Sequence, residues 1–311
     1  MNIILFGAAG FIGTNLALKL GQDSQNRITL ADVNKEYFHP VLQAGDFSLV
    51  ETAVGPETDF ESLFAGQDVV YHLVSTTVPT TSNQQIADEL TANVVMTARL
   101  LDGCVKCGVK KVVFISSGGT VYGKASACPL TEDTPTNPIS SYGVQKVTIE
   151  RLLYLYHYMH GLDYRVIRLA NPYGPYQRPN GVLGAVTTFT YKALKGEKIS
   201  VYGDGSVVRD FIYIDDAVRG IINIAQGDAP ERTFNLGGGQ GTSIRQVLEQ
   251  IESALSIKLD IDYLPGRAVD VPVNYLDISR YEAAYGPLQP VSLQEGILHT
   301  AAFMKYSGMV E

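Results

Sequence analysis

The chain has 311 residues, about twice the usual size of a single domain, so a large domain with a smaller second lobe is expected. Hydrophobic residues make up 45% and charged residues 18% of the chain, a balance that excludes a disordered protein. The formal net charge of −8, without a local Lys/Arg cluster, argues against nucleic acid as a partner. No apolar run is long enough to span a bilayer, and we expect a cytoplasmic location.

Short β-rich runs alternate with helical patterns through the first half of the chain. This alternation predicts a parallel sheet with crossover helices. Several of the runs are apolar throughout, as strands buried on both faces are. The expected strands are residues 2–6, 27–31, 48–53, 69–73, 112–117 and 164–169, and the expected helices are residues 11–20, 59–64, 89–107 and 141–160.

The pattern loosens after residue 170, where proline and glycine residues open a long connection that is typical of a binding loop. We expect residues 211–213 and 234–236 to return to the sheet as strands. Residues 215–225 and 243–255 are expected to form helices.

The expected architecture is therefore a doubly wound α/β fold with a smaller C-terminal lobe. Residues 1–170 form the larger domain, to which segments from about 207–240 return. Residues 171–311 are expected to form mainly a substrate-binding lobe. Cys104 and Cys107 lack enough nearby ligands for a zinc site, so no metal is expected.

A glycine-rich turn directly follows the first expected strand and opens the first expected helix. It reads Gly7-Ala8-Ala9-Gly10-Phe11-Ile12-Gly13. Its glycines let the backbone approach a pyrophosphate whose charge the helix N-terminus stabilises. Asp32 closes the second strand about 20 residues further on, where a carboxylate can bond the ribose hydroxyls of adenosine. The combination predicts a Rossmann-type dinucleotide-binding domain, and the carboxylate favours NAD because it repels the 2′-phosphate of NADP.

Tyr142 and Lys146 lie four residues apart on an expected helix, so they share one face. An ammonium group beside a phenol favours the phenolate, which makes a base of a group whose ordinary pKa is about 10. The chain has 18 tyrosines, so an exposed chance pair is the alternative interpretation. The segments around the pair favour a catalytic role.

These motifs resemble the short-chain dehydrogenase/reductase superfamily, and more narrowly its extended branch of nucleotide-sugar epimerases and dehydratases. The resemblance rests on the glycine spacing, on Asp68-Val-Val-Tyr-His-Leu73, on Pro135-Thr-Asn-Pro-Ile-Ser-Ser141 before Tyr142, and on Ser116-Ser-Gly-Gly-Thr-Val-Tyr-Gly123. It implies that Tyr142 and Lys146 are catalytic. It also implies that the cofactor lies along Leu73, Val74, Ser75, Asn93 and Ser116.

The second half of the chain is similar to the same family in its substrate motifs. Asn171 in Asn-Pro-Tyr-Gly-Pro and Arg209 in Arg-Asp-Phe are implied to contact the substrate diphosphate, and Tyr202 to stack near the base. Arg267 and Asp270 fit a later motif that meets phosphate and ribose. Asn274 occupies a position where some 4-epimerases carry a bulky tyrosine, so the pocket is expected to admit N-acetylated hexoses.

Gly118 departs from the family, which has at this position a Ser or Thr that hydrogen-bonds the reacting sugar hydroxyl. Thr120 is expected to replace it from the loop beyond the strand, with Ser117 as the second candidate. Gly118 and Gly119 also supply neither of the acids that dehydratases and decarboxylases use here, so those reactions are less favoured.

The leading expectation is an NAD-dependent enzyme that epimerises a UDP-hexose at C4. The alternatives are a nucleotide-sugar 4-ketoreductase and a non-catalytic dinucleotide-sensing protein, which would have no need of Tyr142 and Lys146. A homodimer is expected through residues 89–107 and 141–160, because the second helix is apolar over more than one stripe. The apolar residues of that helix include Leu152, Leu153, Leu155, Tyr156 and Met159.

Overall fold

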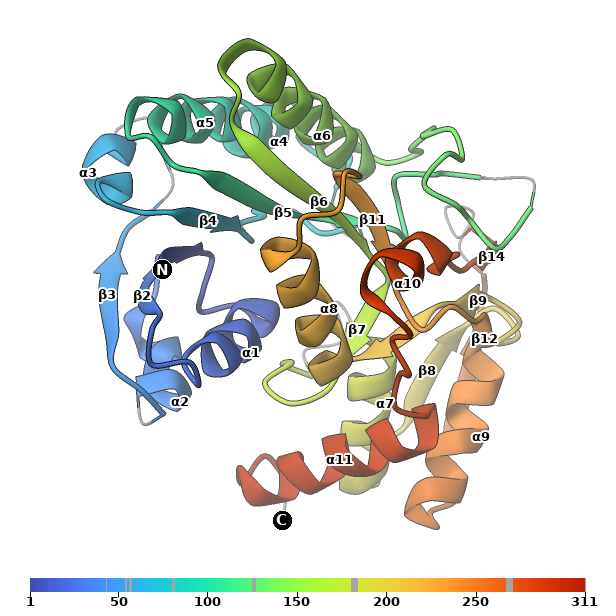
Figure 1. Cartoon of the computed structure of the whole chain (residues 1–311). Helices are drawn as coiled ribbons and strands as arrows, with labels where there is room; N and C mark the ends of the chain where they lie inside the picture. Colours follow the sequence, from blue (N-terminus) through green and yellow to red (C-terminus); the bar gives the residue numbers. More distant parts are fainter. Residues whose placement is uncertain are drawn as a thin grey trace.

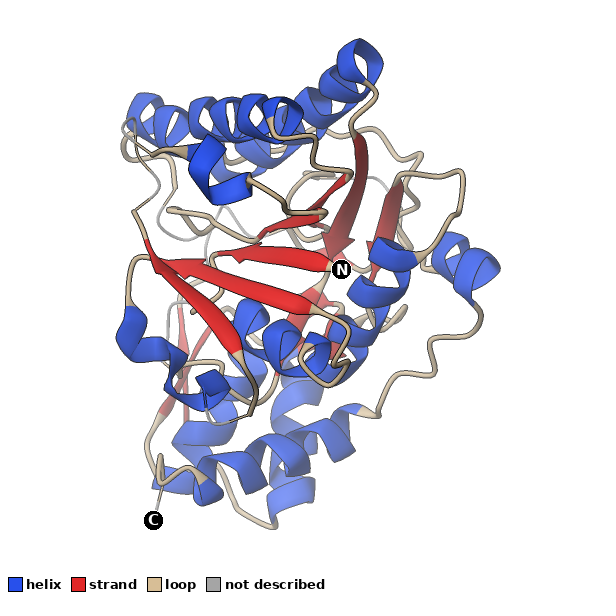
Figure 2. Cartoon of the chain, turned by 60° about the vertical axis from the view of Figure 1, so that its left-hand side comes forward, coloured by secondary structure: helices blue, strands red, loops and turns tan. Residues whose placement is uncertain are grey.

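The computed structural model describes residues 1–42, 44–53, 55, 58–79, 82–124, 127–179, 184–266 and 271–310. Its centre is a seven-stranded parallel sheet with the strand order β11-β6-β5-β4-β1-β2-β3. Figure 2 shows this sheet between two layers of helices. The strands are β1 (Asn2–Phe6), β2 (Arg27–Asp32), β3 (Phe47–Glu51), β4 (Val69–His72), β5 (Lys111–Ser117), β6 (Asp163–Leu169) and β11 (Thr233–Leu236).

The central strands are buried on both faces, and their side chains alternate between two cores. In β1, Ile3 and Leu5 belong to one buried cluster, whereas Ile4 and Phe6 belong to the other. Helices α1 (Phe11–Leu20) and α8 (Ile214–Gln226) pack together on the first side, and α3 (Phe60–Phe64), α5 (Met96–Lys106) and α6 (Ser141–His160) cover the second (Figure 1). The doubly wound α/β fold is therefore confirmed.

The second lobe contains helices and three small sheets that follow the sixth strand. Its helices are α7 (Ala185–Lys195), α9 (Ile244–Leu255) and α11 (Leu293–Tyr306), whereas α10 (Ser279–Tyr285) packs against β11 and α8. Its paired strands are β7 (Asn171–Tyr173) with β10 (Phe211–Tyr213), β8 (Ile199–Tyr202) with β13 (Ile261–Leu264), and β9 (Val208–Arg209) with β12 (Thr242–Ser243) and β14 (Val273–Asn274). Most of these elements have no strong periodic pattern in the sequence.

The expected return of residues 211–213 to the main sheet is wrong. These residues form β10, which pairs with β7 outside the seven-stranded sheet. Strand β6 already has β5 on one side and β11 on the other, so it offers no free edge to β10. Residues 234–236 do return, as part of β11.

The helix expected at residues 89–107 is broken into three parts. It begins earlier, as α4 (Ile86–Leu90), passes through the π-helical turn η2 (Thr91–Val95), and continues as α5. A π-helical turn inserts one extra residue into a helix and often occurs near a functional site. Between β2 and β3 lie the short 3₁₀ helix η1 (Lys35–Phe38) and helix α2 (His39–Leu42).

None of the helices in the described part of the chain combines the length and the apolar character needed to cross a membrane.

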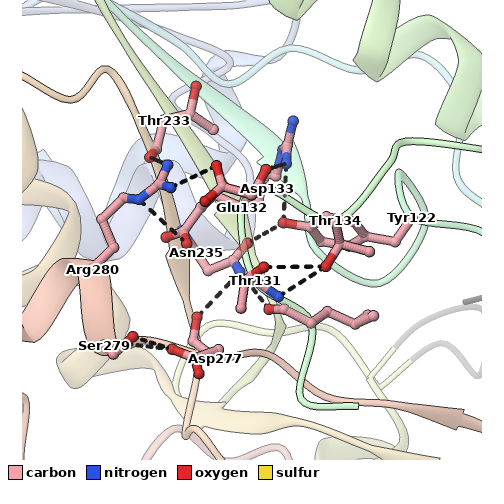
Figure 3. Close-up of polar contacts among 12 residues, drawn as sticks. Tyr122, Thr131, Glu132, Asp133, Thr134, Thr233, Asn235, Asp277, Ser279 and Arg280 are labelled. Carbon is pink, nitrogen blue, oxygen red and sulfur yellow. Dashed lines mark hydrogen bonds and ion pairs between the residues drawn. The ribbon is translucent and has the colours of Figure 1, made fainter. Parts of the chain in front are cut away.

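A buried polar cluster joins β11 to the loop that follows β5 and to the segment before α10 (Figure 3). The side chain of Asn235, which is fully buried, accepts a hydrogen bond from the Tyr122 hydroxyl at 2.6 Å and donates to the carbonyl oxygens of Leu130 and Asp277. The backbone N–H of Asn235 donates to the carboxylate of Glu132 at 2.8 Å. One amide thus connects three segments that are distant in sequence.

Replacing Asn235 by leucine is expected to lower the free energy of unfolding by about 2–3 kcal/mol, because buried hydrogen-bonding groups of Tyr122 and Asp277 lose their partner. Urea unfolding followed by circular dichroism measures the loss. The matched control is Asn223→Leu on α8, where one partly buried hydrogen bond to Tyr281 is removed and about 1 kcal/mol or less is expected. Equal losses in both variants would show that the cluster has no special role.

Candidate active site

Two adjoining cavities form one continuous cleft at the carboxyl ends of the central strands. The first has a volume of about 670 Å³ and extends from the glycine loop past Tyr142 into the second lobe. The second, of about 640 Å³, lies over the end of β2. They share Gly7, Gly10, Phe11, Leu73, Ser75 and Gln177 as lining residues. In open parallel sheets, ligands bind in this position.

The glycine loop fits a dinucleotide pyrophosphate. Gly7 has a positive φ of 90°, and a Cβ atom there would lie 2.9 Å from the backbone nitrogen of Val74. A Cβ atom at Gly13 would lie 2.6 Å from the carbonyl oxygen of Gly7. Gly10 is the N-cap of α1 and has no side chain to cap the helix, so the first N–H groups of the helix can bind an anion. Phe11, Ile12 and Gly13 line the first cavity beside it.

Asp32 lies at the end of β2 and lines the second cavity. Its carboxylate accepts hydrogen bonds from the backbone N–H groups of Ala9, at 2.9 Å, and Val33, at 2.7 Å. These bonds fix the carboxylate beneath the glycine loop, where a ribose diol would meet it. The geometry of this end of the cleft matches the adenosine half of NAD.

The segment after β4 forms one wall of the cleft. Leu73 and Ser75 line both cavities, and Val74 lines the second. Asn93, which was expected to contact the cofactor directly, is buried and lines neither of these cavities. Its amide accepts a hydrogen bond from the backbone N–H of Thr76 and donates to the Thr76 hydroxyl. Asn93 therefore holds the wall in place from the π-helical turn.

Tyr142 lines the first cavity beside the end of β5, and Lys146 is buried one turn further along α6. The Lys146 ammonium donates a hydrogen bond to the carbonyl oxygen of Ile115 at 3.0 Å and lies 5.4 Å from the centre of the Tyr142 ring. The helix thus presents both groups on one face, as expected from their spacing.

Burial changes the pKa of both groups. It raises the pKa of the Tyr142 phenol to about 12, and a hydrogen bond with Ser117 acts in the opposite direction. Burial lowers the pKa of the Lys146 ammonium to about 8, while the negative charge of Glu150 raises it. Without ligands the phenol is therefore neutral at pH 7, which differs from the expectation that Lys146 alone acidifies it. The desolvation of a phenolate outweighs the attraction of an ammonium at this distance.

Ser116 lines the first cavity, but its hydroxyl is directed away from it. It donates a hydrogen bond of 2.5 Å to the carboxylate of Glu150, two turns along α6 from Tyr142. Glu150 also forms a buried ion pair with Arg168 of β6, with 2.7 Å between the charged atoms. Arg168 donates a further hydrogen bond to the hydroxyl of Tyr122 at 3.0 Å.

The other end of the first cavity lies in the second lobe. Asn171, Tyr202 and Arg209 all line it. The Arg209 guanidinium donates hydrogen bonds to the carbonyl oxygens of Val208 and Val271, which hold it at the wall. Arg267 and Asp270 lie outside the described residues. Asn274 is buried and does not line the cavity; its amide nitrogen lies 3.4 Å from the carbonyl oxygen of Gly118, so its position gives no support to a role in sugar size.

A family model described as the NAD dependent epimerase/dehydratase family matches residues 3–237. The chain belongs to this family. A UDP-glucose 4-epimerase of Mycolicibacterium smegmatis is 34% identical over 310 residues, which cover 98% of this chain and 99% of the relative. The resemblance expected from the motifs is thus confirmed.

Solved structures agree with this membership of the epimerase/dehydratase family. A UDP-glucose 4-epimerase from Thermotoga maritima with UDP-glucose has a TM-score of 0.91 and 32% identity, over 99% of both chains. A UDP-glucuronic acid 4-epimerase from Bacillus cereus, in complex with UDP-glucuronic acid and NAD, has a TM-score of 0.88 and 27% identity, over 99% of this chain and 100% of that chain.

Gly118, where the resemblance implies a Ser or Thr, is closely packed in this structure. A Cβ atom at Gly118 would lie 2.6 Å from a methyl group of Leu276 and 3.0 Å from the carbonyl oxygen of Arg168. Leu276 belongs to the segment after β14, so the second lobe occupies the space that a side chain would need. A side chain at position 118 would therefore require the Leu276 side chain to repack.

The structure reverses the order of the two replacement hydroxyls. Ser117 lines the cavity and hydrogen-bonds Tyr142. Thr120 does not line the cavity, and its hydroxyl oxygen is buried without a hydrogen-bond partner in the described part of the chain. Ser117 is the last residue of β5, whereas Thr120 lies in the loop beyond the strand. Ser117 is the hydroxyl that this member of the epimerase/dehydratase family places at the phenol.

Sequence reasoning missed several residues of the cleft. Gln177 lines both cavities, and its position two residues after the Asn-Pro-Tyr-Gly-Pro turn was the available signal. Glu150 stands four residues after Lys146, at the spacing that places it on the same helical face. The further lining residues include Thr77, Val78, Pro79, Tyr173, Thr188 and Phe189.

Ser117→Ala is expected to lower turnover about 100-fold, because a positioned hydroxyl next to the acid–base group is lost. The variant should also move the acidic limb of the pH profile to higher pH, since the hydrogen bond from Ser117 lowers the pKa of Tyr142 and its loss raises it. Turnover measured from pH 6 to pH 10 tests both effects. Thr120→Val is the matched control and should stay within about threefold of the wild type. The opposite ranking would restore Thr120 as the relay.

Proposed function

We propose that the protein is a UDP-hexose 4-epimerase that keeps NAD bound through its catalytic cycle. One observation carries the proposal: Tyr142, hydrogen-bonded to Ser117, stands in the cavity between the glycine loop and the second lobe. This position lets one phenol reach a sugar whose nucleotide lies in the second lobe and whose C4 faces the cofactor. The relatives with this fold are named for 4-epimerisation of UDP-glucose and UDP-glucuronic acid.

Tyr142 would move the proton in this reaction. When bound, NAD supplies the acceptor for the hydride that leaves C4 of the sugar, and later returns it. The Tyr142 oxygen takes the proton of the C4 hydroxyl as the C4–O bond becomes a carbonyl. It returns the proton after the keto sugar has turned over in the site. Ser117 can donate to the phenolate and accept from the sugar hydroxyl, which relays the same proton. The ammonium of Lys146 stabilises the phenolate from behind.

The lining of the first cavity supports a neutral sugar. Arg209 of β9 is the one charged side chain among the described residues that line it, and the resemblance places it at the nucleotide end. The other polar side chains of the described lining are uncharged, and include those of Thr77, Gln177 and Thr188. Such groups pair with sugar hydroxyls, whereas a buried carboxylate of a uronate needs a cation. A UDP-hexose therefore fits the lining better than a UDP-hexuronate.

With no cofactor added, the purified protein should interconvert UDP-glucose and UDP-galactose and reach the same mixture from either side, with no net formation of NADH. Proton NMR follows the products. UDP-glucuronate should remain unchanged under the same conditions. Tyr142→Phe is the control, and should retain NAD in the denatured supernatant while losing at least about 100-fold in turnover. Turnover of a 4-keto sugar only with added NADH would show a ketoreductase instead.

We also propose that the enzyme is a cytoplasmic homodimer. In α6, Ile149 and Leu153 face the core, whereas Leu155, Tyr158 and Met159 are exposed, Tyr158 to 80%. The helix packs beside α5, where the Tyr156 hydroxyl bonds Asp102 at 2.6 Å (Figure 1). An exposed apolar stripe on a two-helix face supports a symmetric interface with a second copy.

The variant Leu155→Glu/Met159→Glu is expected to be a monomer, because two carboxylates would be desolvated in the interface. Sedimentation velocity at micromolar concentration should give twice the mass of one chain for the wild type. Tyr306→Glu on α11 is the control: this residue is 93% exposed, so the substitution should leave the dimer intact. A monomeric wild type would refute the dimer without affecting the proposed reaction.

A further inference from the structure

The loop at residues 174–179 crosses the cleft between its two cavities. Gln177 lines both cavities, and its neighbours Tyr176 and Arg178 line the second, together with Asp32. Gln177 donates a hydrogen bond to the carbonyl oxygen of Pro172 at 3.2 Å, and accepts one from the Thr187 hydroxyl. This loop therefore lies over the groove in which a dinucleotide would extend from the glycine turn to Asp32.

Both lobes hold this crossing loop. On the side of the first domain, the Asn15 amide of α1 donates to the carbonyl oxygen of Pro175 at 3.0 Å. On the side of the second lobe, the Tyr176 ring packs edge-on against Phe303 of α11, with 4.7 Å between the ring centres. The loop is thus fixed at its middle, and its end at Arg178 reaches across the adenosine side of the cleft.

Arg178 stacks there on Tyr37. The central carbon of its guanidinium lies 3.4 Å from the centre of the Tyr37 ring. Tyr37 comes from η1, which follows β2, so the stack joins the opposite walls of the second cavity. Tyr37 remains 45% exposed, so its contact with Arg178 is formed at the mouth of the cavity and not in the core.

We propose that the Tyr37–Arg178 stack is a clasp that closes the adenosine end of the cleft over bound NAD and slows its release. The inference rests on NAD as the cofactor, but not on which sugar is epimerised. Release of the adenosine half requires the two walls to separate, and this breaks the stack. Slow release suits an enzyme that must return hydride to the same substrate, because free NADH would end the cycle.

The test measures NAD release from the intact protein without substrate. Wild-type protein is loaded with isotopically labelled NAD and mixed with excess unlabelled NAD, and the label that stays bound is followed by rapid gel filtration and mass spectrometry. Tyr37→Ala and Arg178→Ala should each release NAD about 2- to 30-fold faster, the range expected for the loss of one cation–π contact. Tyr37→Phe keeps the ring and should release NAD nearly as slowly as the wild type.

The double variant Tyr37→Ala/Arg178→Ala distinguishes a clasp from two separate contacts with NAD. If the stack acts as one unit, the double variant should release NAD no faster than either single variant. If the increase in the release rate of the double variant equals the product of the two single increases, the clasp is overturned, because each side chain would then contact NAD by itself. Unchanged release in both single variants would overturn it as well. Turnover of UDP-glucose by the wild type tests the proposed reaction separately, so the two ideas can fail independently.

Discussion

The buried carboxylate of Glu150 on α6 is stabilised by one group from each of two neighbouring strands. These contacts hold the helix that carries Tyr142 against the central sheet. Its carboxylate forms an ion pair with the Arg168 guanidinium, with 2.7 Å between the charged atoms, and accepts a hydrogen bond from the Ser116 hydroxyl. A buried ion costs several kcal/mol to desolvate, so removal of Arg168 would leave an uncompensated charge at a cost of about 3–5 kcal/mol. The pair therefore ties α6, which carries Tyr142 and Lys146, to strands β5 and β6. Through Tyr122 and Asn235 the same network reaches the loop after β5 and the segment before α10.

The same burial controls when the phenol can act. With the pKa of Tyr142 at about 12, a phenolate is rare at neutral pH, although Lys146, with a pKa of about 8, is mostly charged. One ammonium is not enough to offset the desolvation of the phenolate. A further positive charge in the cleft, such as that of an oxidised nicotinamide, would lower the pKa of Tyr142 and favour its action as a base.

The sequence predicted those parts of the site that are built from residues close together along the chain. The glycine loop is defined by a strand before it and a helix after it, and Tyr142 and Lys146 by their spacing on one helix. Predictions failed where tertiary contacts decide. Residues 211–213 leave the main sheet because β11 occupies the edge, and Asn93 faces a loop because of a π-helical turn that the sequence does not announce. The choice between Thr120 and Ser117 as the relay also depends on where the loop turns after β5, and it stays a prediction.

Gly118 shows how the second lobe determines the chemistry of the first. Leu276 fills the space beside Gly118, and its backbone N–H is held at 3.2 Å from the carboxylate of Asp210, so the segment cannot easily move away. A side chain at position 118 would have to displace the end of the Leu276 side chain, whereas glycine leaves room for it. The hydroxyl then has to come from a residue that already faces the cavity. Ser117 meets this condition because it lines the cavity and hydrogen-bonds Tyr142. Close packing around Gly118 and the position of Ser117 beside the phenol are therefore linked.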